Sequence, residues 1–234
     1  MIAAIHQPLY IPWQPYFAKI ARSDVFVFLD DVQYPRSKGF FNRNAIKGPQ
    51  GPLFLTVPVK GRADMPSVRE IAVDSSCNWQ QKHWKTISLN YAKAPHFKAA
   101  RQTIEAIYVG RSWERLCDVN VELIRRVAEL MGIQTRFVFS SELGLPRDEG
   151  MKERLIAILK AVGADQYLTG KGAGSLRYMD EEEFAKNGVR VLWHEYRQSP
   201  YTQLWGPFLP DMSIIDLLFN CGPGSRRLLL EGRG

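Results

Sequence analysis

Apolar positions at the start of the chain predict a strand, a helix and a second strand. Residues 2–5 form a short apolar run that ends at His6, and the closely spaced prolines after it stop the strand. From Trp13, apolar side chains recur at the i, i+3, i+4 and i+7 spacing of a helix with one buried face. Residues 25–29 are uniformly apolar and are either β-branched, aromatic or leucine, which is typical of a buried parallel strand. The opening therefore predicts a β-loop-α-β unit.

The middle of the chain adds two features to this unit. Residues 40–46 and 53–59 predict a hairpin around a turn at 47–51 that contains glycine and proline. Residues 78–131 then predict a mostly helical insertion with breaks near 94–95 and 110–111.

The remaining pattern restores the alternation of strands and helices. Strands are expected at 68–73, 136–139, 166–169 and 189–193, and helices at 151–162, 180–187 and 213–220. Such alternation is typical of an α/β protein. We expect one domain over residues 1–234, with a mostly parallel Rossmann-like sheet flanked by helices, a hairpin and the helical insertion.

Composition and charge narrow the class of protein. Hydrophobic residues make up 45% of the 234 positions and charged residues 24%, so a disordered or fibrous chain is excluded. The formal net charge of +7 suits nucleic acid, an anionic membrane surface or anionic small molecules. Because Lys and Arg are scattered and no nucleic-acid-binding motif is visible, a nucleic-acid partner is not expected.

The N-terminus and the cysteines indicate a cytoplasmic protein. No basic segment precedes an apolar stretch at the N-terminus, and no apolar run approaches the roughly 18 residues that cross a membrane. Cys77, Cys117 and Cys221 are widely spaced and form no C-x-x-C pair, which argues against disulfides and a thiolate zinc site. We expect buried thiols in a reducing compartment.

The predicted sheet brings two polar corners to one edge. In parallel α/β units, ligands bind beyond the carboxyl ends of the strands, where His6 and Gln7 follow one strand and Asp30 and Asp31 another. These four residues are the catalytic candidates: an imidazole for acid-base work, an amide that positions substrate, and carboxylates that orient an amine, a ribose or Mg²⁺. The alternatives are a histidine that caps the loop and a solvated pair of carboxylates.

Candidate substrate-binding residues lie in four further segments. Tyr10 offers a ring for stacking on a base or sugar, and the glycine-rich turn after residue 169 offers backbone N–H groups to an anion. The other candidates supply amides, fixed positive charge or an aromatic hydroxyl; the full set is Tyr10, Asn42, Arg43, Asn44, Lys47, Thr169, Gly170, Lys171 and Tyr196. No metal ligands are assigned, and the cofactor stays open, with a nucleotide and Mg²⁺ as the candidate.

Several blocks of the sequence resemble the WbqC-like family. They are Ile5-His6-Gln7-Pro8, Pro12-Trp13, Tyr16-Phe17, residues 24–34, Asn42-Arg43-Asn44, residues 55–59, 79–84, 201–203 and 213–220. The resemblance implies a role in bacterial O-antigen and polysaccharide gene clusters, with glycine transfer onto a sugar suggested for some members. It supplies no catalytic residues, and the turn at 170–175 is more glycine-rich than the resemblance leads us to expect.

Together these observations favour an aminoacyl or acyl transferase that acts on a nucleotide-linked amino sugar. The partner would be a small molecule, either the nucleotide sugar or the acyl donor. Two alternatives stay open: a nucleotidyltransferase-like enzyme that uses ATP or CTP, and a binding module of a polysaccharide assembly pathway. The sequence also leaves the oligomeric state open, a homo-oligomer included.

Overall fold

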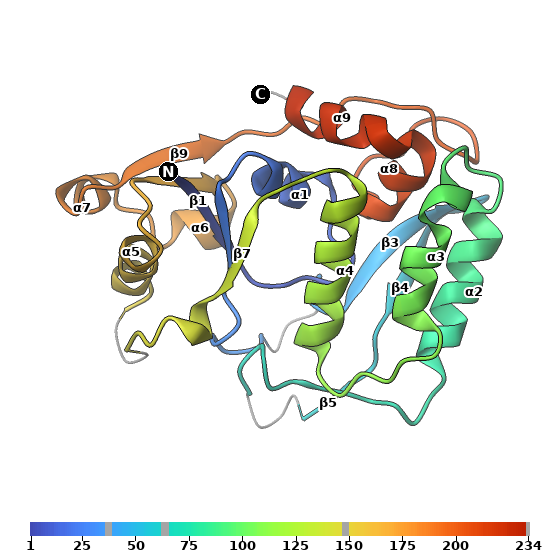
Figure 1. Ribbon diagram of the computed structural model, residues 1–234, viewed down its shortest axis with the longest axis horizontal. Helices are drawn as coiled ribbons and strands as arrows, with labels where there is room; N and C mark the ends of the chain where they lie inside the picture. Colours follow the sequence, from blue (N-terminus) through green and yellow to red (C-terminus); the bar gives the residue numbers. More distant parts are fainter. Residues whose placement is uncertain (36–38, 62–65, 147–149, 233–234) are drawn as a thin grey trace.

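A five-stranded, entirely parallel sheet organises the computed structural model, which describes residues 1–35, 39–61, 66–146 and 150–232 (Figure 1). Its strand order is β7-β2-β1-β8-β9. The strands are β1 (Ile2–His6), β2 (Val25–Phe28), β7 (Arg136–Phe139), β8 (Gln166–Gly170) and β9 (Arg190–His194). The expected α/β class with a Rossmann-like parallel sheet is confirmed.

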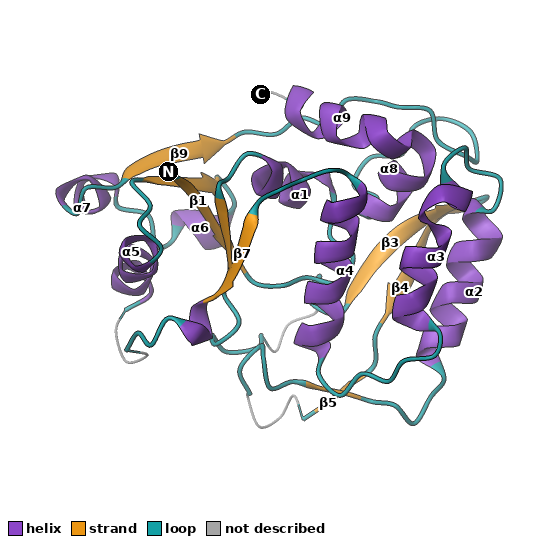
Figure 2. Ribbon diagram, in the orientation of Figure 1, coloured by secondary structure: helices purple, strands orange, loops and turns teal. Residues whose placement is uncertain are grey.

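Two small antiparallel sheets and the helices complete the described structure (Figure 2). The small sheets pair β3 (Arg43–Gly48) with β4 (Gly51–Thr56) and β5 (Val59–Lys60) with β6 (Ala72–Val73). The α-helices are α1 (Gln14–Ala21), α2 (Trp79–Tyr91), α3 (Phe97–Tyr108), α4 (Leu116–Leu130), α5 (Met151–Ala161), α6 (Ala173–Leu176), α7 (Glu181–Lys186), α8 (Ile214–Cys221) and α9 (Ser225–Glu231).

The chain adds strands to the sheet first on one side of β1 and then on the other. From β1 the chain builds β2 and then β7 on one side, and it then returns to place β8 and β9 on the other side of β1. Such a topological switch point opens a crevice beyond the carboxyl ends of the two central strands. The fold therefore predicts a ligand site next to His6 and Gly170.

Alternate side chains of the central strands enter two separate cores. Phe26 and Phe28 of β2 pack on the side covered by α1, α4 and α8, whereas Val25 and Val27 pack on the side covered by α5 and α7. The ring of Phe28 stacks on that of Phe137 of β7, with centroids 5.3 Å apart. A strand with apolar side chains on both faces is what a parallel sheet between two helical layers requires.

The helices expected over residues 78–131 are present as α2, α3 and α4. They form, with the β3–β4 hairpin, a lobe beside the sheet (Figure 1). Asn120 of α4 fastens this lobe to the loop after β1, because its amide donates to the carbonyl oxygens of Pro8 and Phe41.

Some boundaries differ from the sequence-based expectation. The first hairpin strand begins and ends later than expected, and the second begins and ends earlier. Gly48 therefore pairs with Gly51, and only Pro49 and Gln50 form the turn. The expected strand at 68–73 contracts to β6, and a helix, α9, follows the glycines where we expected the last helix to end.

No helix in the part of the chain that the structure describes is long and apolar enough to cross a membrane. The expectation of buried cysteines holds for Cys117, whereas Cys77 is exposed and Cys221 is half-buried.

Candidate functional site

A cavity of about 590 Å³ lies at the topological switch point, beyond the carboxyl ends of β1 and β8. It is referred to below as the switch-point cavity. Its walls combine apolar and polar side chains; the lining residues are Ile5, His6, Gln7, Leu29, Val32, Gln33, Met151, Leu155, Tyr167, Gly172, Gly174, Ser175 and Tyr178. This volume is in the range of sites for small organic ligands, roughly 300–1,000 Å³.

The His6–Gln7 turn is held in one conformation by two bonds to the same oxygen. The backbone carbonyl of Gln7 lies 3.0 Å from His6 Nδ1 and accepts a hydrogen bond of 3.1 Å from the Tyr16 hydroxyl. Because a carbonyl oxygen only accepts, Nδ1 carries the proton and donates it. The ring of Tyr16 also packs edge-on against the imidazole, with centroids 5.0 Å apart.

The His6 imidazole is neutral at physiological pH. Burial, together with the positive charge of Lys19, lowers the pKa of His6 from 6.5 to about 3. With Nδ1 protonated and the ring uncharged, the lone pair of Nε2 is free to accept a hydrogen bond or a proton. Burial also lowers the pKa of Lys19, to about 8.

Three polar side chains of the lining have no hydrogen-bond partner in the described residues: Gln7, Gln33 and Ser175. They come from three separate segments, the turn after β1, the loop after β2 and helix α6. Polar groups that converge on a cavity without partners of their own are suited to bind a ligand.

The glycine-rich turn after β8 exposes bare backbone to this cavity. A Cβ added at Gly172 or Gly174 would meet no heavy atom within 4 Å, and neither glycine has a positive φ. Both positions line the cavity, so a ligand can approach the main chain there without displacing any side chain. Neither the backbone conformation nor the packing of the protein itself thus requires glycine at these positions.

Asp30 joins the ends of β2 and β7. Its carboxylate accepts hydrogen bonds from the Ser140 hydroxyl at 3.1 Å, the Ser141 amide at 3.0 Å and the Ser141 hydroxyl at 2.7 Å. The residue is only 3% exposed. These donors compensate the desolvated charge, so Asp30 fixes the spacing of two strand ends.

Asp31 forms a buried ion pair with Arg154 of α5. The Arg154 guanidinium donates to one Asp31 oxygen, and the Ser140 hydroxyl lies 2.6 Å from the other. Both side chains are almost inaccessible, at 5% for Arg154 and 1% for Asp31. Since Met151 and Leu155 of the same helix line the switch-point cavity, this pair sets the position of that wall.

The turn after β1 and the loop after β2 therefore line one cavity, as expected. The residues of the second loop that do so are not the two aspartates that we expected. The loop after β2 contributes Leu29, Val32 and Gln33 to the cavity that His6 and Gln7 line. The carboxylates of Asp30 and Asp31 are engaged with serines and Arg154 and are not among the lining groups. Their geometry suits positioning of the walls rather than contact with a ligand in this cavity.

Most of the other candidate residues lie in the lobe, away from the switch point. Tyr10 is fully buried, and its hydroxyl lies 2.8 Å from both His83 Nδ1 and the Tyr108 hydroxyl, so neither face of its ring is free for stacking. The amides of Asn42 and Asn44 donate to the backbone carbonyls of Val57 and Ile11.

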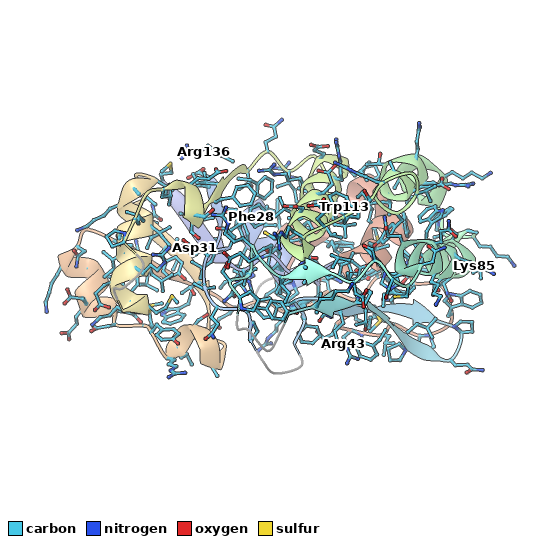
Figure 3. All side chains as sticks on the ribbon, turned by 90° about the horizontal axis from the view of Figure 1, so that it is seen from below. Phe28, Asp31, Arg43, Lys85, Trp113 and Arg136 are labelled. Atoms are coloured by element: carbon cyan, nitrogen blue, oxygen red, sulfur yellow. The ribbon has the colours of Figure 1, made fainter. Side chains whose placement is uncertain are left out.

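Arg43 and Lys47 also serve the hairpin. The Arg43 guanidinium lies over the Phe54 ring, 4.2 Å from its centroid. The Lys47 ammonium is buried and donates to Gln203 Oε1 and to the carbonyl of Gly206. Figure 3 shows Arg43 on the hairpin and Asp31 near the sheet, in different parts of the molecule.

The candidates after residue 168 remain near the sheet edge. Thr169 is buried within β8, Gly170 ends that strand, and Lys171 forms an exposed ion pair with Glu195. The Tyr196 hydroxyl donates to Gln14 Oε1 at 3.0 Å and thereby joins the segment after β9 to α1.

Two groups of residues were missed by sequence reasoning. Ser140 and Ser141 follow β7, and extending the strand-end argument to this third strand would have identified them. The buried role of Arg154 could not be predicted, because a single arginine in an amphipathic helix is ordinarily solvated. Among the described residues, no group of three or more His, Cys, Asp or Glu side chains is arranged to hold a metal ion.

Comparison with known proteins identifies the family. The model of the WbqC-like protein family matches residues 7–228. The chain belongs to this family. A WbqC-like chain of similar size is the uncharacterized protein Rv1507c of Mycobacterium tuberculosis (strain ATCC 25618 / H37Rv), which is 38% identical over 222 residues, or 94% of this chain and 93% of the relative. No solved structure matches this WbqC-like protein.

Proposed function

We propose that this WbqC-like protein is a transferase of bacterial surface polysaccharide (O-antigen) biosynthesis that binds a nucleotide-linked amino sugar in the switch-point cavity. The observation that carries the proposal is the bare backbone of Gly172 and Gly174 beside three unpartnered polar side chains. Glycine-rich turns at this place in Rossmann-like folds bring backbone N–H groups to phosphates. The resemblance that the sequence blocks carry points to the same pathway.

The lining supports a sugar or nucleoside moiety as the part of the ligand that this cavity holds. In the parts of the chain that the structure describes, no side chain that is charged at neutral pH lines the cavity. Amides and a hydroxyl match the hydroxyl and amide groups of an amino sugar, and the apolar side chains of the lining match the flat face of a ring. Lys171 is the nearest cation along the turn, and a phosphate would compete with Glu195 for it.

His6 is suited to act as the proton acceptor. In the reaction proposed, the sugar amine attacks an acyl carbon, a C–N bond forms, and the bond from that carbon to its leaving group breaks. The amine proton passes to His6 Nε2, which is unprotonated in the tautomer that donates to Gln7. A bound phosphate would raise the pKa of His6 from its low value in the free protein.

The placement of the carboxylates favours this function over the nucleotidyltransferase alternative. Mg²⁺ in nucleotide sites is usually held by one or two carboxylates together with substrate phosphates. The two carboxylates that follow β2 at this sheet edge, Asp30 and Asp31, are engaged with Ser140, Ser141 and Arg154.

A thermal-shift panel of nucleotide-linked amino sugars tests the binding step. A ligand at about 100 times its Kd stabilises the folded state by about 2.7 kcal/mol, which raises Tm measurably. Gly172→Val fills the open space at an extended backbone position that suits valine, with φ −68° and ψ 152°, and should abolish the shift. Gly224→Val, at another glycine without Cβ neighbours, is the matched control and should retain it.

The catalytic step has its own test. His6→Gln should retain the thermal shift and lose turnover, because it keeps a polar side chain but removes the proton acceptor. The proposal fails if no nucleotide sugar raises Tm, or if Gly172→Val binds as the unmodified protein does.

A further inference from the structure

A second cavity, of about 490 Å³, lies at the same sheet edge, beyond the carboxyl ends of β2 and β7. It is referred to below as the charged cavity. Its walls come from the loop before β6, the first turn of α4 and the segment after β7; the lining residues are Asp30, Arg69, Glu70, Arg115, Cys117, Asp118, Phe139, Ser141 and Glu142. Figure 1 shows the start of α4 and the end of β7 at the same end of the molecule.

The loop after β2 lies between the two cavities. Leu29, Val32 and Gln33 line the switch-point cavity, whereas Asp30 lines the charged one. The hydrogen bonds from Ser140 and Ser141 hold Asp30 in place in the wall of the charged cavity.

Arg69, Asp118 and Glu142 bring charges of opposite sign to this cavity. Among the described residues, no hydrogen bond or ion pair engages the Arg69 guanidinium or the carboxylates of Asp118 and Glu142. Arg69 and Asp118 both act electrostatically on Cys117, yet no ion pair within 4 Å joins them. The two charges therefore face the same space from separate walls.

The side chain between them is also unengaged. Cys117 is 4% exposed, lines the cavity, and its thiol has no hydrogen-bond partner in the described ranges. Burial raises the pKa of this thiol to about 12, so it stays neutral and adds no charge of its own. Burial likewise raises the pKa of the Asp118 carboxyl, although Arg115 opposes that rise.

We propose that the charged cavity binds a small zwitterion, whose anionic group pairs with Arg69 and whose ammonium group pairs with Asp118 and Glu142. A ligand of a single sign would be repelled by one of these two sets of charges, whereas a zwitterion can pair with both. Arg69 can hold a carboxylate by two parallel hydrogen bonds, while an ammonium group can donate to two carboxylates. The proposal does not depend on which ligand occupies the switch-point cavity.

Calorimetric titration with matched small molecules tests it. The zwitterionic probes are glycine, β-alanine and γ-aminobutyrate, which differ in the separation of their charges. The single-charge probes are n-butylamine and butyrate, which keep the length of γ-aminobutyrate but lack one of its charges. At least one zwitterion should bind about tenfold more tightly than either single-charge probe.

Two substitutions at exposed side chains assign the contacts. Arg69→Gln and Asp118→Asn should each weaken zwitterion binding by about tenfold or more, with little effect on folding because neither side chain has a hydrogen bond or ion pair to another described residue. Arg136→Gln, at the opposite end of β7, and Asp211→Asn are matched controls that should bind as before. Gly172→Val should also keep zwitterion binding, because Gly172 lines the switch-point cavity and not the charged cavity.

Three results would overturn the proposal. They are no saturable binding of any zwitterion, equal binding of a single-charge probe, and unchanged binding by both Arg69→Gln and Asp118→Asn. A failure of the nucleotide-sugar panel with zwitterion binding intact would count against the proposed function only.

Discussion

Among the described residues, one buried network at the sheet edge and another in the lobe each hold carboxylates. The sheet-edge network consists of Asp30, Asp31, Ser140, Ser141 and Arg154. The lobe network consists of Lys47, Tyr91, Tyr201, Gln203 and Asp216. The Asp31 carboxylate is paired directly with a guanidinium, whereas Asp216 accepts from Tyr91 at 2.6 Å, Tyr201 at 2.7 Å and Gln203 at 2.9 Å. Lys47 is linked to Asp216 through Gln203. The side-chain oxygen of Gln203 accepts from the Lys47 ammonium, and its side-chain nitrogen donates to the Asp216 carboxylate.

This difference separates a network that supports a site from one that supports the fold. None of the five residues of the lobe network lines the switch-point cavity or the charged cavity, and the network ties the hairpin, α2, α8 and the segment at 201–203 together. In the sheet-edge network, Asp30 and Ser141 line the charged cavity and Arg154 lies on the helix that walls the other. Damage to the lobe network should reduce stability alone, and damage to the sheet-edge network should also reduce binding.

Asp216→Ala should have the largest effect on stability. It leaves four donors, from Tyr91, Tyr201, Gln203 and Asn220, without this acceptor, and breaking such a network costs about 3–5 kcal/mol. Urea unfolding should show this loss as a lower midpoint at an unchanged slope. Ligand binding by the fraction that remains folded should be unaltered. Asp211→Asn, at an exposed position with φ 61° that asparagine tolerates, is the control and should unfold as the unmodified protein does.

Arg154→Met should cost slightly less stability and should also impair binding. It removes the partner of a buried carboxylate, for which we expect about 3 kcal/mol. Because α5 walls the switch-point cavity, nucleotide-sugar binding should weaken too, as measured by titration below the unfolding transition. In the double variant with Asp31→Leu the loss should be smaller than the sum of the two single losses, because no charge is left unpaired. Intact binding in folded Arg154→Met protein would remove the distinction between the networks.

The sequence predicted the backbone of this arrangement better than its side-chain partners. Apolar runs and strand-end residues located the sheet, its carboxyl edge and the His6–Gln7 turn, because these follow from local periodicity and from a general property of parallel sheets. The role of Asp31 depends on Arg154, more than one hundred residues away along the chain. Tyr10 was expected to face a ligand because it lies in a loop, yet His83 and Tyr108 from the lobe bury it. Long-range packing of this kind leaves no local pattern in a single sequence.

A histidine in each region, His6 at the sheet edge and His83 in the lobe, should reduce stability in mild acid. His194 of β9, whose pKa burial also lowers to about 4, should add to the loss. Burial lowers the pKa of His6 to about 3 and that of His83, in the lobe, to about 4, from 6.5 when unfolded. The unfolded chain therefore binds more protons below pH 6.5, so stability is complete above that pH and falls as the pH decreases towards the folded-state values. Each histidine should account for about 2 kcal/mol of loss at pH 5.

The two histidines should differ in what else their replacement changes. His6→Gln and His83→Gln should each flatten the dependence of unfolding free energy on pH by a similar amount, measured in urea between pH 5 and pH 7.5. Only His6→Gln should abolish turnover. An unchanged pH dependence in His6→Gln would mean that this imidazole is charged in the folded protein, and the proton-acceptor role would fail with it.

The exposed ion pair between Lys171 and Glu195 should matter least for stability. Both side chains are 53% exposed, and exposed pairs contribute about 0–1 kcal/mol, most of it removed by salt. Lys171→Gln should therefore change the unfolding free energy by less than about 0.5 kcal/mol at physiological salt. If a phosphate displaces Glu195, the same substitution should weaken nucleotide-sugar binding, and Glu195→Gln should strengthen it by freeing the ammonium group. Opposite effects of the two variants on binding, with equal and small effects on unfolding, would place the phosphate at this turn, whereas parallel effects would place it elsewhere.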